Sequence, residues 1–268
     1  MIVDVDAYLE RIGHTGTRAP TLATLCALHR QHMLTVPFEN LDIPLGRRIT
    51  LAPDALWNKI VAGRRGGFCY ELNTLFGRLL QTLGYRVDFL SARVWTATDF
   101  GPDKDHMALL VDVDGQPWLA DVGFGDSFLV PLRLEPGTPQ DDGVKAFRLR
   151  TDGDRWIVQV QERGRPWNDE YRFELDAHPP EAFQPMCDYQ QTSPDSAFTR
   201  RAVCSRATAR GRVTVTHDRL IVTIGDQLID SPLRDAAEFR AALATHHQIR
   251  LTPDEAATIV ARFSRPAE

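Results

Sequence analysis

The sequence contains few cysteines, and their spacing is not typical of disulfide-rich or zinc-binding proteins. Four cysteines occur in 268 residues, and they are Cys26, Cys69, Cys187 and Cys204. Small secreted domains and zinc modules need paired or closely spaced cysteines, and no Cys-x-x-Cys pair is present. We therefore expect a reduced, cytoplasmic protein that binds no metal.

Long apolar runs and an excess of basic residues are also missing. No stretch reaches the roughly 18 consecutive apolar residues that a membrane-spanning helix needs. The N-terminal segment MIVDVDAYLERIG carries acidic residues where a secretory signal is basic and apolar. The formal net charge is -5, with 31 Lys and Arg against 36 Asp and Glu. These features favour neither a membrane nor a nucleic acid as the partner.

The hydrophobic pattern changes along the chain and divides it into parts. Residues 1–84 show helical periodicity, and residues 85–175 alternate in the manner of strands. The segment 176–200 is rich in Pro, Asp, Ser and Gln, which predicts an interdomain linker with a short helix. Residues 201–268 combine a hairpin with two helices. This order predicts an α+β protein rather than a doubly wound α/β fold.

Local signals predict several elements of the C-terminal part. The alternating stretch 211–224 reads as a hairpin with His217 and Asp218 at its turn. A helix is expected from about residue 235 to 247. Thr252 is a good N-cap for a last helix, since Pro253 suits the first helical position and Glu255 completes a capping box.

The segment RRGGFCYELNTLFGRLLQTLG, residues 64–84, predicts a helix with one buried stripe that includes Cys69. Gly66 and Gly67 precede it and leave the entering backbone unusual freedom and room for a ligand. A cysteine in the first turn of a helix is near the positive end of the helix dipole, which favours the thiolate. The competing interpretation is that Cys69 is a small core residue.

The segment HMALLVDVDGQPWLADVGFG, residues 106–125, predicts a hairpin that brings His106 close to Asp121. If Asp114 and Gly115 form a two-residue loop, paired positions sum to 229, so Asp121 faces Ala108. His106 is then the diagonal neighbour of Asp121 on one face, within reach of its side chain. A three-residue loop would separate them onto opposite faces.

A carboxylate beside an imidazole fixes its tautomer, and an imidazole beside a thiol accepts its proton. The three residues Cys69, His106 and Asp121 therefore make a candidate catalytic triad. The alternative is a surface hairpin with an incidental histidine, but the apolar neighbours of Asp121 disfavour an unpaired carboxylate there.

The chain resembles the arylamine N-acetyltransferase family at several motifs, in the family's order. They are Pro37-Phe38-Glu39-Asn40-Leu41, Arg65-Gly66-Gly67-Phe68-Cys69-Tyr70-Glu71-Leu72-Asn73, His106, Asp121-Val122-Gly123-Phe124-Gly125, and Ser193-Pro194-Asp195-Ser196-Ala197-Phe198. The resemblance implies a helical lobe, a β-barrel lobe and an α/β lid around a cysteine-protease-like core. It also implies ping-pong acetyl transfer from acetyl-CoA through Cys69 to an arylamine or hydrazine.

The same resemblance assigns roles to residues around the triad. Phe38 and Phe124 are expected to line the acceptor pocket, and Phe198 to edge the cofactor cleft. Arg65 with Glu39 is expected to form a buried pair that steadies the Cys69 turn. Macrocycle-forming amide synthases, a thioester hydrolase and a binding protein with an inactive triad remain the alternatives.

Overall fold

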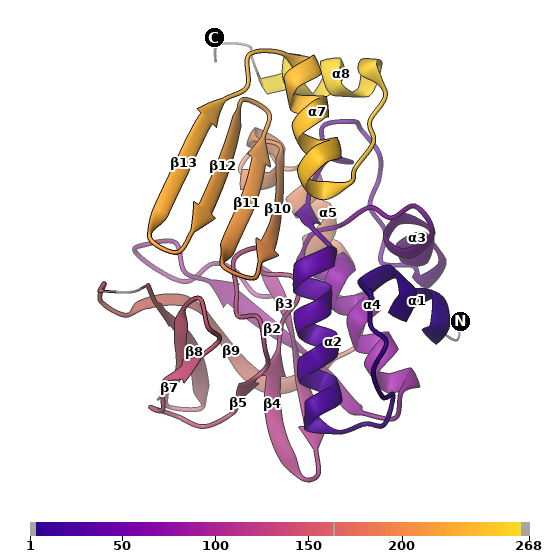
Figure 1. Cartoon of the computed structure of the whole chain (residues 1–268). Coiled ribbons are helices and arrows are strands. Elements are labelled where there is room, and N and C mark those ends of the chain that lie inside the picture. The colour runs from indigo at the N-terminus through magenta and orange to yellow at the C-terminus, as the bar shows by residue number, and fades with distance from the viewer. Residues whose placement is uncertain (1–3, 163, 264–268) are drawn as a thin grey trace.

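The computed structural model describes residues 4–162 and 164–263 of the chain. The N-terminal part is helical, as expected. It contains α1 (Val5–Ile12), α2 (Leu22–Thr35), the short strand β1 (Phe38–Glu39), α3 (Pro53–Trp57), the π-helical turn η1 (Asn58–Ala62) and α4 (Cys69–Thr82). Figure 1 shows α2 and α4 running side by side, with α1 and α3 beside them.

The central part is an antiparallel sheet of eight strands in the order β5-β4-β3-β2-β9-β8-β7-β6. Its strands are β2 (Arg86–Val94), β3 (His106–Val113), β4 (Gln116–Ala120), β5 (Leu132–Arg133), β6 (Gln140–Asp141), β7 (Ala146–Asp152), β8 (Arg155–Gln161) and β9 (Asn168–His178). The two edge strands, β5 and β6, lie close together. The Gln140 side chain of β6 accepts from the Arg133 N–H of β5 at 2.7 Å and donates to the Arg133 carbonyl at 3.0 Å. The sheet is therefore a nearly closed barrel.

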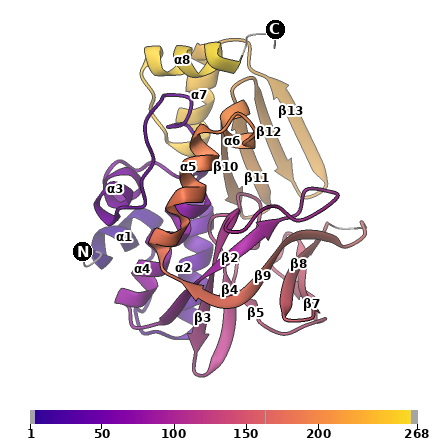
Figure 2. The same cartoon turned by 180° about the vertical axis from the view of Figure 1, so that it is seen from behind.

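The segment 176–200, expected to be a linker with a short helix, begins with the last residues of β9 and is more regular than a linker. It folds into the 3₁₀ turn η2 (Pro180–Phe183), α5 (Gln184–Thr192) and α6 (Ala197–Arg200). Pro180 and Pro185 lie in the first turns of η2 and α5, where a proline does not remove a helical hydrogen bond. Figure 2 shows α5 crossing the back of the molecule between the end of β9 and the C-terminal sheet.

The C-terminal part is a second antiparallel sheet with two helices packed near it. It contains β10 (Val203–Thr208), β11 (Gly211–Thr216), β12 (Arg219–Ile224), β13 (Gln227–Pro232), α7 (Ala236–His247) and α8 (Pro253–Phe263). The predicted hairpin and both helices are confirmed. The capping box is present, since Glu255 N–H donates to Thr252 Oγ1 at 3.2 Å and Thr252 N–H donates to Glu255 Oε2 at 2.7 Å.

Strand β1 connects the N-terminal helices to this C-terminal sheet. Phe38 pairs with Ser205 and Glu39 pairs with Cys204, so β1 extends the order β10-β11-β12-β13 by one strand. The Glu39 N–H also donates to the Gly67 carbonyl at 2.9 Å, next to the start of α4. Because of these contacts, the helical part, the C-terminal sheet and the Cys69 turn are packed together. The fold class is α+β, as predicted.

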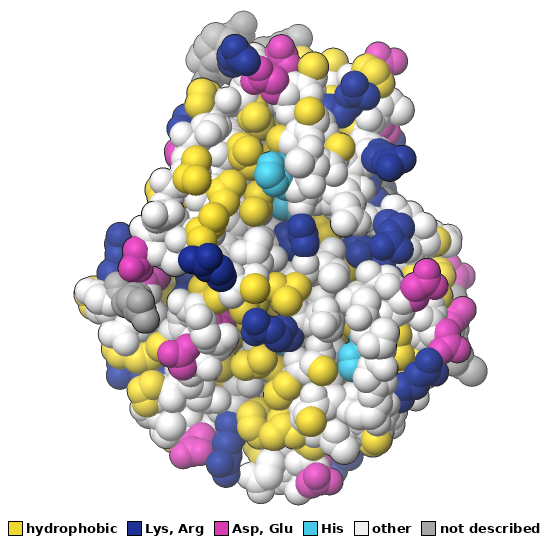
Figure 3. Space-filling view, in the orientation of Figure 1, with side chains coloured by type: hydrophobic (Ala, Val, Ile, Leu, Met, Phe, Trp, Pro, Cys, Tyr) yellow, Lys and Arg dark blue, Asp and Glu magenta, His cyan; other side chains and the backbone are white. Residues whose placement is uncertain are grey.

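Within the described residues, no helix combines the length and apolar character needed to cross a membrane. The surface in Figure 3 mixes basic, acidic and apolar side chains, with apolar ones gathered over the C-terminal strands. In that region Leu228 and Ile229 of β13 are 65% and 52% exposed.

Candidate active site

Cys69 lies at the first position of α4 and is almost completely buried. Its exposed fraction is 4%. The helix begins here because the Glu71 side chain accepts a hydrogen bond from the Phe68 N–H at 3.1 Å, which satisfies one of the free donors of the first turn. The expected single buried stripe understates the burial, since every residue from 69 to 77 is buried. The N-terminal half of α4 is a core element that presents Cys69 from inside the protein.

Gly66 and Gly67 are required by close packing on both sides of the turn. A Cβ on Gly66 would lie 1.9 Å from the Pro37 carbonyl oxygen, and one on Gly67 would lie 2.8 Å from the Glu71 side chain. Neither glycine has a positive φ. The glycines therefore serve to bring β1 and α4 together, rather than to provide an unusual backbone conformation.

A buried network of charges supports this turn. Arg65 donates to both carboxylate oxygens of Glu39, at 3.0 and 3.1 Å, and Glu39 is fully buried. Arg65 also contacts Asp42 at 3.2 Å. Lys59 joins the network through Asp42 and Glu71, each at 2.8 Å. The pair expected between Arg65 and Glu39 is present, within a larger network whose other members the sequence did not indicate.

His106 and Asp121 are in direct contact. The His106 Nε2 lies 2.7 Å from Asp121 Oδ2, and the two residues are 2% and 0% exposed. The β3–β4 ladder pairs Val113 with Gln116 and Leu109 with Ala120, which is the predicted register. Asp114 and Gly115 have φ of 53° and 78°, as a two-residue hairpin turn requires. His106 begins β3, and Asp121 directly follows β4.

Asn73 connects the cysteine helix to this pair. It lies four residues after Cys69 and therefore on the same side of α4. Its amide nitrogen donates to Asp121 Oδ1 at 2.9 Å and to the Met107 carbonyl at 2.6 Å, and its oxygen accepts from the Val122 N–H at 3.0 Å. These three bonds hold the start of α4 against the ends of β3 and β4.

The Cys69 backbone and sulfur are placed by the same two strands. The Met107 backbone lies close enough to the Cys69 thiol to lower its pKa, so the sulfur lies beside the residue that follows His106. A Cβ on Gly123 would lie 2.7 Å from the Cys69 Cα, so the chain after Asp121 packs directly on Cys69. The structure thus brings the cysteine, the imidazole and the carboxylate into one buried region.

His29 of α2 contacts the backbone of Asp121. The Asp121 N–H donates to His29 Nε2 at 3.1 Å, and His29 Nδ1 lies 3.1 Å from the Leu129 carbonyl. Burial lowers the pKa of His29 to about 4, which keeps the imidazole neutral. In this form Nδ1–H donates to Leu129 and Nε2 accepts from Asp121. The sequence did not indicate this contact of His29.

Burial and neighbouring groups act in opposite directions on the pKa values of Asp121 and Cys69. Burial would raise the pKa of Asp121, but the hydrogen bond and charge of His106, together with Asn73 and the Gly123 N–H, hold the pKa below its usual value. Burial raises the pKa of the Cys69 thiol well above its usual value, and the Met107 backbone opposes this effect. The expected benefit of the helix dipole does not offset the desolvation, so a thiolate here needs an imidazolium beside it.

Aromatic side chains surround the three residues, and several are partly exposed. Phe124 lies with its ring centroid 5.2 Å from that of His106. Phe38 and Phe198 are 6.0 Å apart, and Phe198 is 5.6 Å from Phe68, the neighbour of Cys69. Phe38, Phe124 and Phe198 are only partly buried. The fully buried Tyr171, which the sequence did not indicate, also packs against His106, with its ring centroid 5.1 Å from that of the imidazole.

No group of three or more metal-ligating side chains occurs within residues 4–162 and 164–263.

Comparison with known proteins identifies the class of enzyme to which this fold and site belong. The sequence model of the N-acetyltransferase family matches residues 21–256. The arylamine N-acetyltransferase of Escherichia coli is 35% identical over 224 residues, which are 78% of this chain and 75% of that protein. The class is therefore that of the acyltransferases.

Solved structures of arylamine N-acetyltransferases have the same fold as this chain. Arylamine N-acetyltransferase from Salmonella typhimurium superimposes with a TM-score of 0.91 at 30% identity, over 98% of this chain and 100% of that one. The Mycobacterium marinum enzyme, solved in complex with CoA, gives a TM-score of 0.89 at 31% identity over 97% and 98% of the two chains. The chain belongs to the arylamine N-acetyltransferase family.

Proposed function

We propose that this protein transfers an acetyl group from acetyl-CoA to an arylamine or arylhydrazine through an acetyl-Cys69 intermediate. The observation that carries the proposal is the buried His106–Asp121 pair, 2.7 Å apart, beside the helix that presents Cys69. Membership of the arylamine N-acetyltransferase family and the CoA complex of the Mycobacterium marinum relative support the choice of substrates.

The geometry supports a defined proton path. Because His106 Nε2 is held by Asp121, Nδ1 is the nitrogen available to Cys69. Nδ1 takes the thiol proton, and the resulting thiolate attacks the thioester carbonyl of acetyl-CoA. The CoA thiolate leaves and takes the proton from the imidazolium. In the second half-reaction the acceptor amine attacks acetyl-Cys69, His106 takes the amine proton, and the Cys69 sulfur leaves.

His106 therefore carries the proton between the reacting groups in each half-reaction. Asp121 stabilises the imidazolium that forms in both half-reactions, and Asn73 and the Gly123 N–H hold Asp121 in position. This arrangement compensates for the high pKa that burial imposes on the Cys69 thiol. Backbone N–H groups near Cys69 supply donors for the tetrahedral oxyanion.

The partly exposed aromatic residues suit a flat acceptor. Phe124 lies beside His106, and Phe38 packs against Gly125, one residue further along the chain. These rings offer an aromatic wall for an arylamine whose nitrogen reaches the acetyl group. Phe198 lies against Phe38 and is assigned to the edge of the CoA cleft. The four free cysteines support a reduced, cytoplasmic location for the protein.

Intact-mass measurement after mixing with acetyl-CoA alone tests the proposal. We expect a gain of one acetyl group, which is lost when an arylamine is added. The gain should be absent in Cys69→Ser and unchanged in Cys187→Ser, which removes another buried free cysteine. Persistence of the acetyl group in Cys69→Ser would refute the covalent mechanism.

The same experiment separates the alternative functions. A thioester hydrolase would lose the acetyl group without any amine, and an amide synthase would not be acetylated from acetyl-CoA. A binding protein with an inactive triad would show no mass change, and iodoacetamide would not label Cys69 ahead of the other cysteines.

A further inference from the structure

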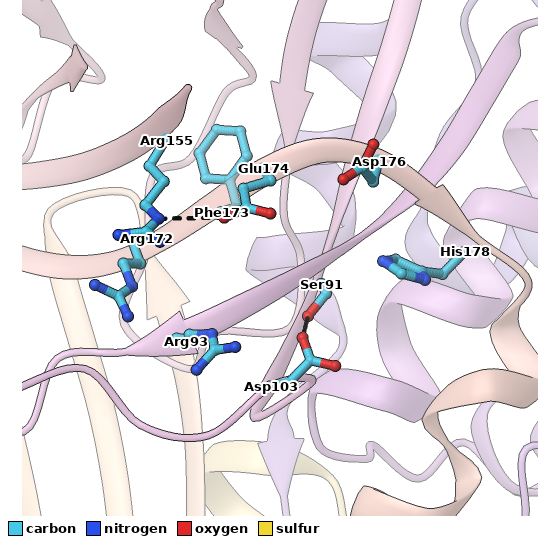
Figure 4. A pocket seen from close by; sticks show the side chains of 9 residues that line it. All are labelled: Ser91, Arg93, Asp103, Arg155, Arg172, Phe173, Glu174, Asp176 and His178. Atoms are coloured by element: carbon cyan, nitrogen blue, oxygen red, sulfur yellow. Dashed lines mark hydrogen bonds and ion pairs between the residues drawn. The ribbon is translucent and has the colours of Figure 1, made fainter. Parts of the chain in front are cut away.

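A small polar pocket lies on the outer face of the barrel, across strands β2 and β9. Its volume is about 140 Å³, and it is lined by residues of β2, β9, the start of β8 and the segment that precedes β3 (Figure 4). The pocket is separate from the Cys69 region. Ala92, which lies between Ser91 and Arg93 on β2, is buried and pairs with His106, so its two neighbours point to the opposite face.

Two arginines meet in this pocket at directly opposed positions. Arg93 of β2 pairs with Arg172 of β9 in the antiparallel ladder, so their side chains leave the sheet on one face about 5 Å apart at Cβ. Like charges at such positions destabilise a sheet. In the described part of the chain, neither guanidinium forms an ion pair with a carboxylate, although Arg93 lies close enough to Asp103 to help lower the pKa of that carboxyl.

Two acidic residues of the pocket make their close contacts with side chains other than Arg93 and Arg172. Asp103 accepts a hydrogen bond from the Ser91 hydroxyl at 2.7 Å and forms an ion pair with Lys104 at 2.5 Å. Glu174 forms an ion pair with Arg155 at 3.2 Å. Figure 4 shows Asp176 with His178 on the other side of the pocket from the arginines. The two arginines therefore lie together at one end of the pocket, and Asp103 offsets the charge of Arg93 only in part.

The orientation of Arg172 leaves its hydrogen-bond donors available. Its guanidinium lies over the Phe100 ring, 4.7 Å from the centroid, so the aromatic ring occupies one flat face of the group. The N–H groups in the guanidinium plane remain free to bind a ligand. A guanidinium held in this way loses little conformational freedom when it binds an oxyanion.

We propose that Arg93 and Arg172 form a binding site for a phosphate group. Paired guanidinium groups recognise phosphate through several charge-assisted hydrogen bonds, and the pocket has room for one such group. A dianion between the two arginines removes their mutual repulsion. The phosphate belongs either to a free phosphorylated metabolite or to CoA, whose long pantetheine arm separates its phosphates from the thiol.

Calorimetric titration with inorganic phosphate, at constant ionic strength, tests the site directly. We expect wild-type protein to bind phosphate, and Arg93→Gln and Arg172→Gln each to weaken binding about tenfold or more, because each removes charge-assisted hydrogen bonds. Arg155→Gln is the matched control, since its guanidinium lines the same pocket but is paired with Glu174. It should leave the affinity within about twofold of wild type, as expected for loss of an exposed pair. Thermal unfolding of each variant verifies that it is folded.

A kinetic measurement identifies the source of the phosphate, and only this arm rests on the proposed function. If CoA supplies it, both arginine variants raise the KM for acetyl-CoA while that for acetyl-pantetheine, which lacks the phosphates, stays unchanged. If a free metabolite supplies it, phosphate binding is lost while both KM values are unchanged. Wild-type protein that binds no phosphate, or variants that bind it as tightly as wild type, overturn the site even if acetyl transfer is intact.

Discussion

The Asn73 amide donates a hydrogen bond to the Asp121 carboxylate at 2.9 Å, which joins the helix that carries the cysteine to the carboxylate that orients the histidine. Asn73 also bonds the Met107 carbonyl and the Val122 N–H, on either side of the His106–Asp121 pair. One side chain thereby fixes the distance between the Cys69 turn and the two strand ends. We regard Asn73 as a positioning residue, because none of its atoms needs to touch a substrate.

Replacement of Asn73 by Ala should impair both stability and catalysis. The change leaves the Val122 N–H and the Met107 carbonyl buried without this partner, which costs about 1–3 kcal/mol for each group. A purely structural role predicts lower stability with normal kcat in the folded fraction. We expect kcat itself to fall, together with the rate at which iodoacetamide alkylates Cys69. Normal values of both in folded Asn73→Ala protein would exclude the positioning role.

Local features of the site followed from the sequence. The register of the His106–Asp121 hairpin depends only on Asp114 and Gly115 and on a side-chain period of two, so simple counting located the pair. The predicted cap of the last helix involves Thr252 and Glu255, which are three positions apart, so each side chain reaches the backbone of the other. The apolar spacing that follows Cys69 likewise placed this residue in the first turn of a helix, and the structure has it at the first position of α4.

Contacts between distant segments were not predictable in this way. The bond between His29 and the Asp121 N–H spans 92 positions, and the pairing of β1 with β10 involves a strand of only two residues. Neither leaves a periodic signal. The approach of Cys69 to His106 was supported by resemblance to a family rather than by pattern. The burial of Cys69 was also underestimated, because spacing along the chain does not show how many neighbours exclude water from the thiol. The effect of that burial on the pKa of the thiol was therefore missed.

Replacement of Asp121 by Asn should reduce kcat by about four orders of magnitude, as for other histidine–carboxylate pairs. The amide NH₂ of the new side chain would face His106 Nε2, which forces this nitrogen to accept and places the proton on Nδ1. The imidazole then has no acceptor for the Cys69 proton. Steady-state kinetics measure the effect. Asp112→Asn in the same hairpin is the control and should keep nearly full activity; an equal loss in both variants would point to hairpin distortion.

Replacement of His106 by Gln should change how Cys69 alkylation depends on pH. Without the imidazole, burial keeps the pKa of the thiol raised, and the thiolate forms only as the pH passes that raised value. We expect the iodoacetamide rate at neutral pH to fall about a hundredfold and to keep rising into the alkaline range. In the wild type the imidazolium compensates the thiolate, so the rate should level off at lower pH. Identical pH profiles for the two proteins would contradict the proton path through His106.

Replacement of Arg65 by Met should destabilise the protein strongly. Glu39 is fully buried, and without Arg65 its carboxylate keeps the Leu41 N–H bond at 2.8 Å and the attraction of the Lys59 charge but loses its direct ion pair. Removing one partner of a buried pair costs about 3–5 kcal/mol, which urea unfolding can measure. Arg18→Met is the matched control, because Arg18 and Asp6 are 54% and 77% exposed, and it should cost about 0.5 kcal/mol or less.

A second substitution separates the loss of charge balance from the loss of packing. Glu39→Gln in the Arg65→Met background removes the uncompensated charge and should recover a large part of the lost stability, because the neutral amide is far less costly to bury. If the double variant is no more stable than Arg65→Met alone, the pair acts through packing of the Arg65 stem. In that case the Cys69 turn is held mainly by the close contact of Gly66 with Pro37 and by the Glu71 cap.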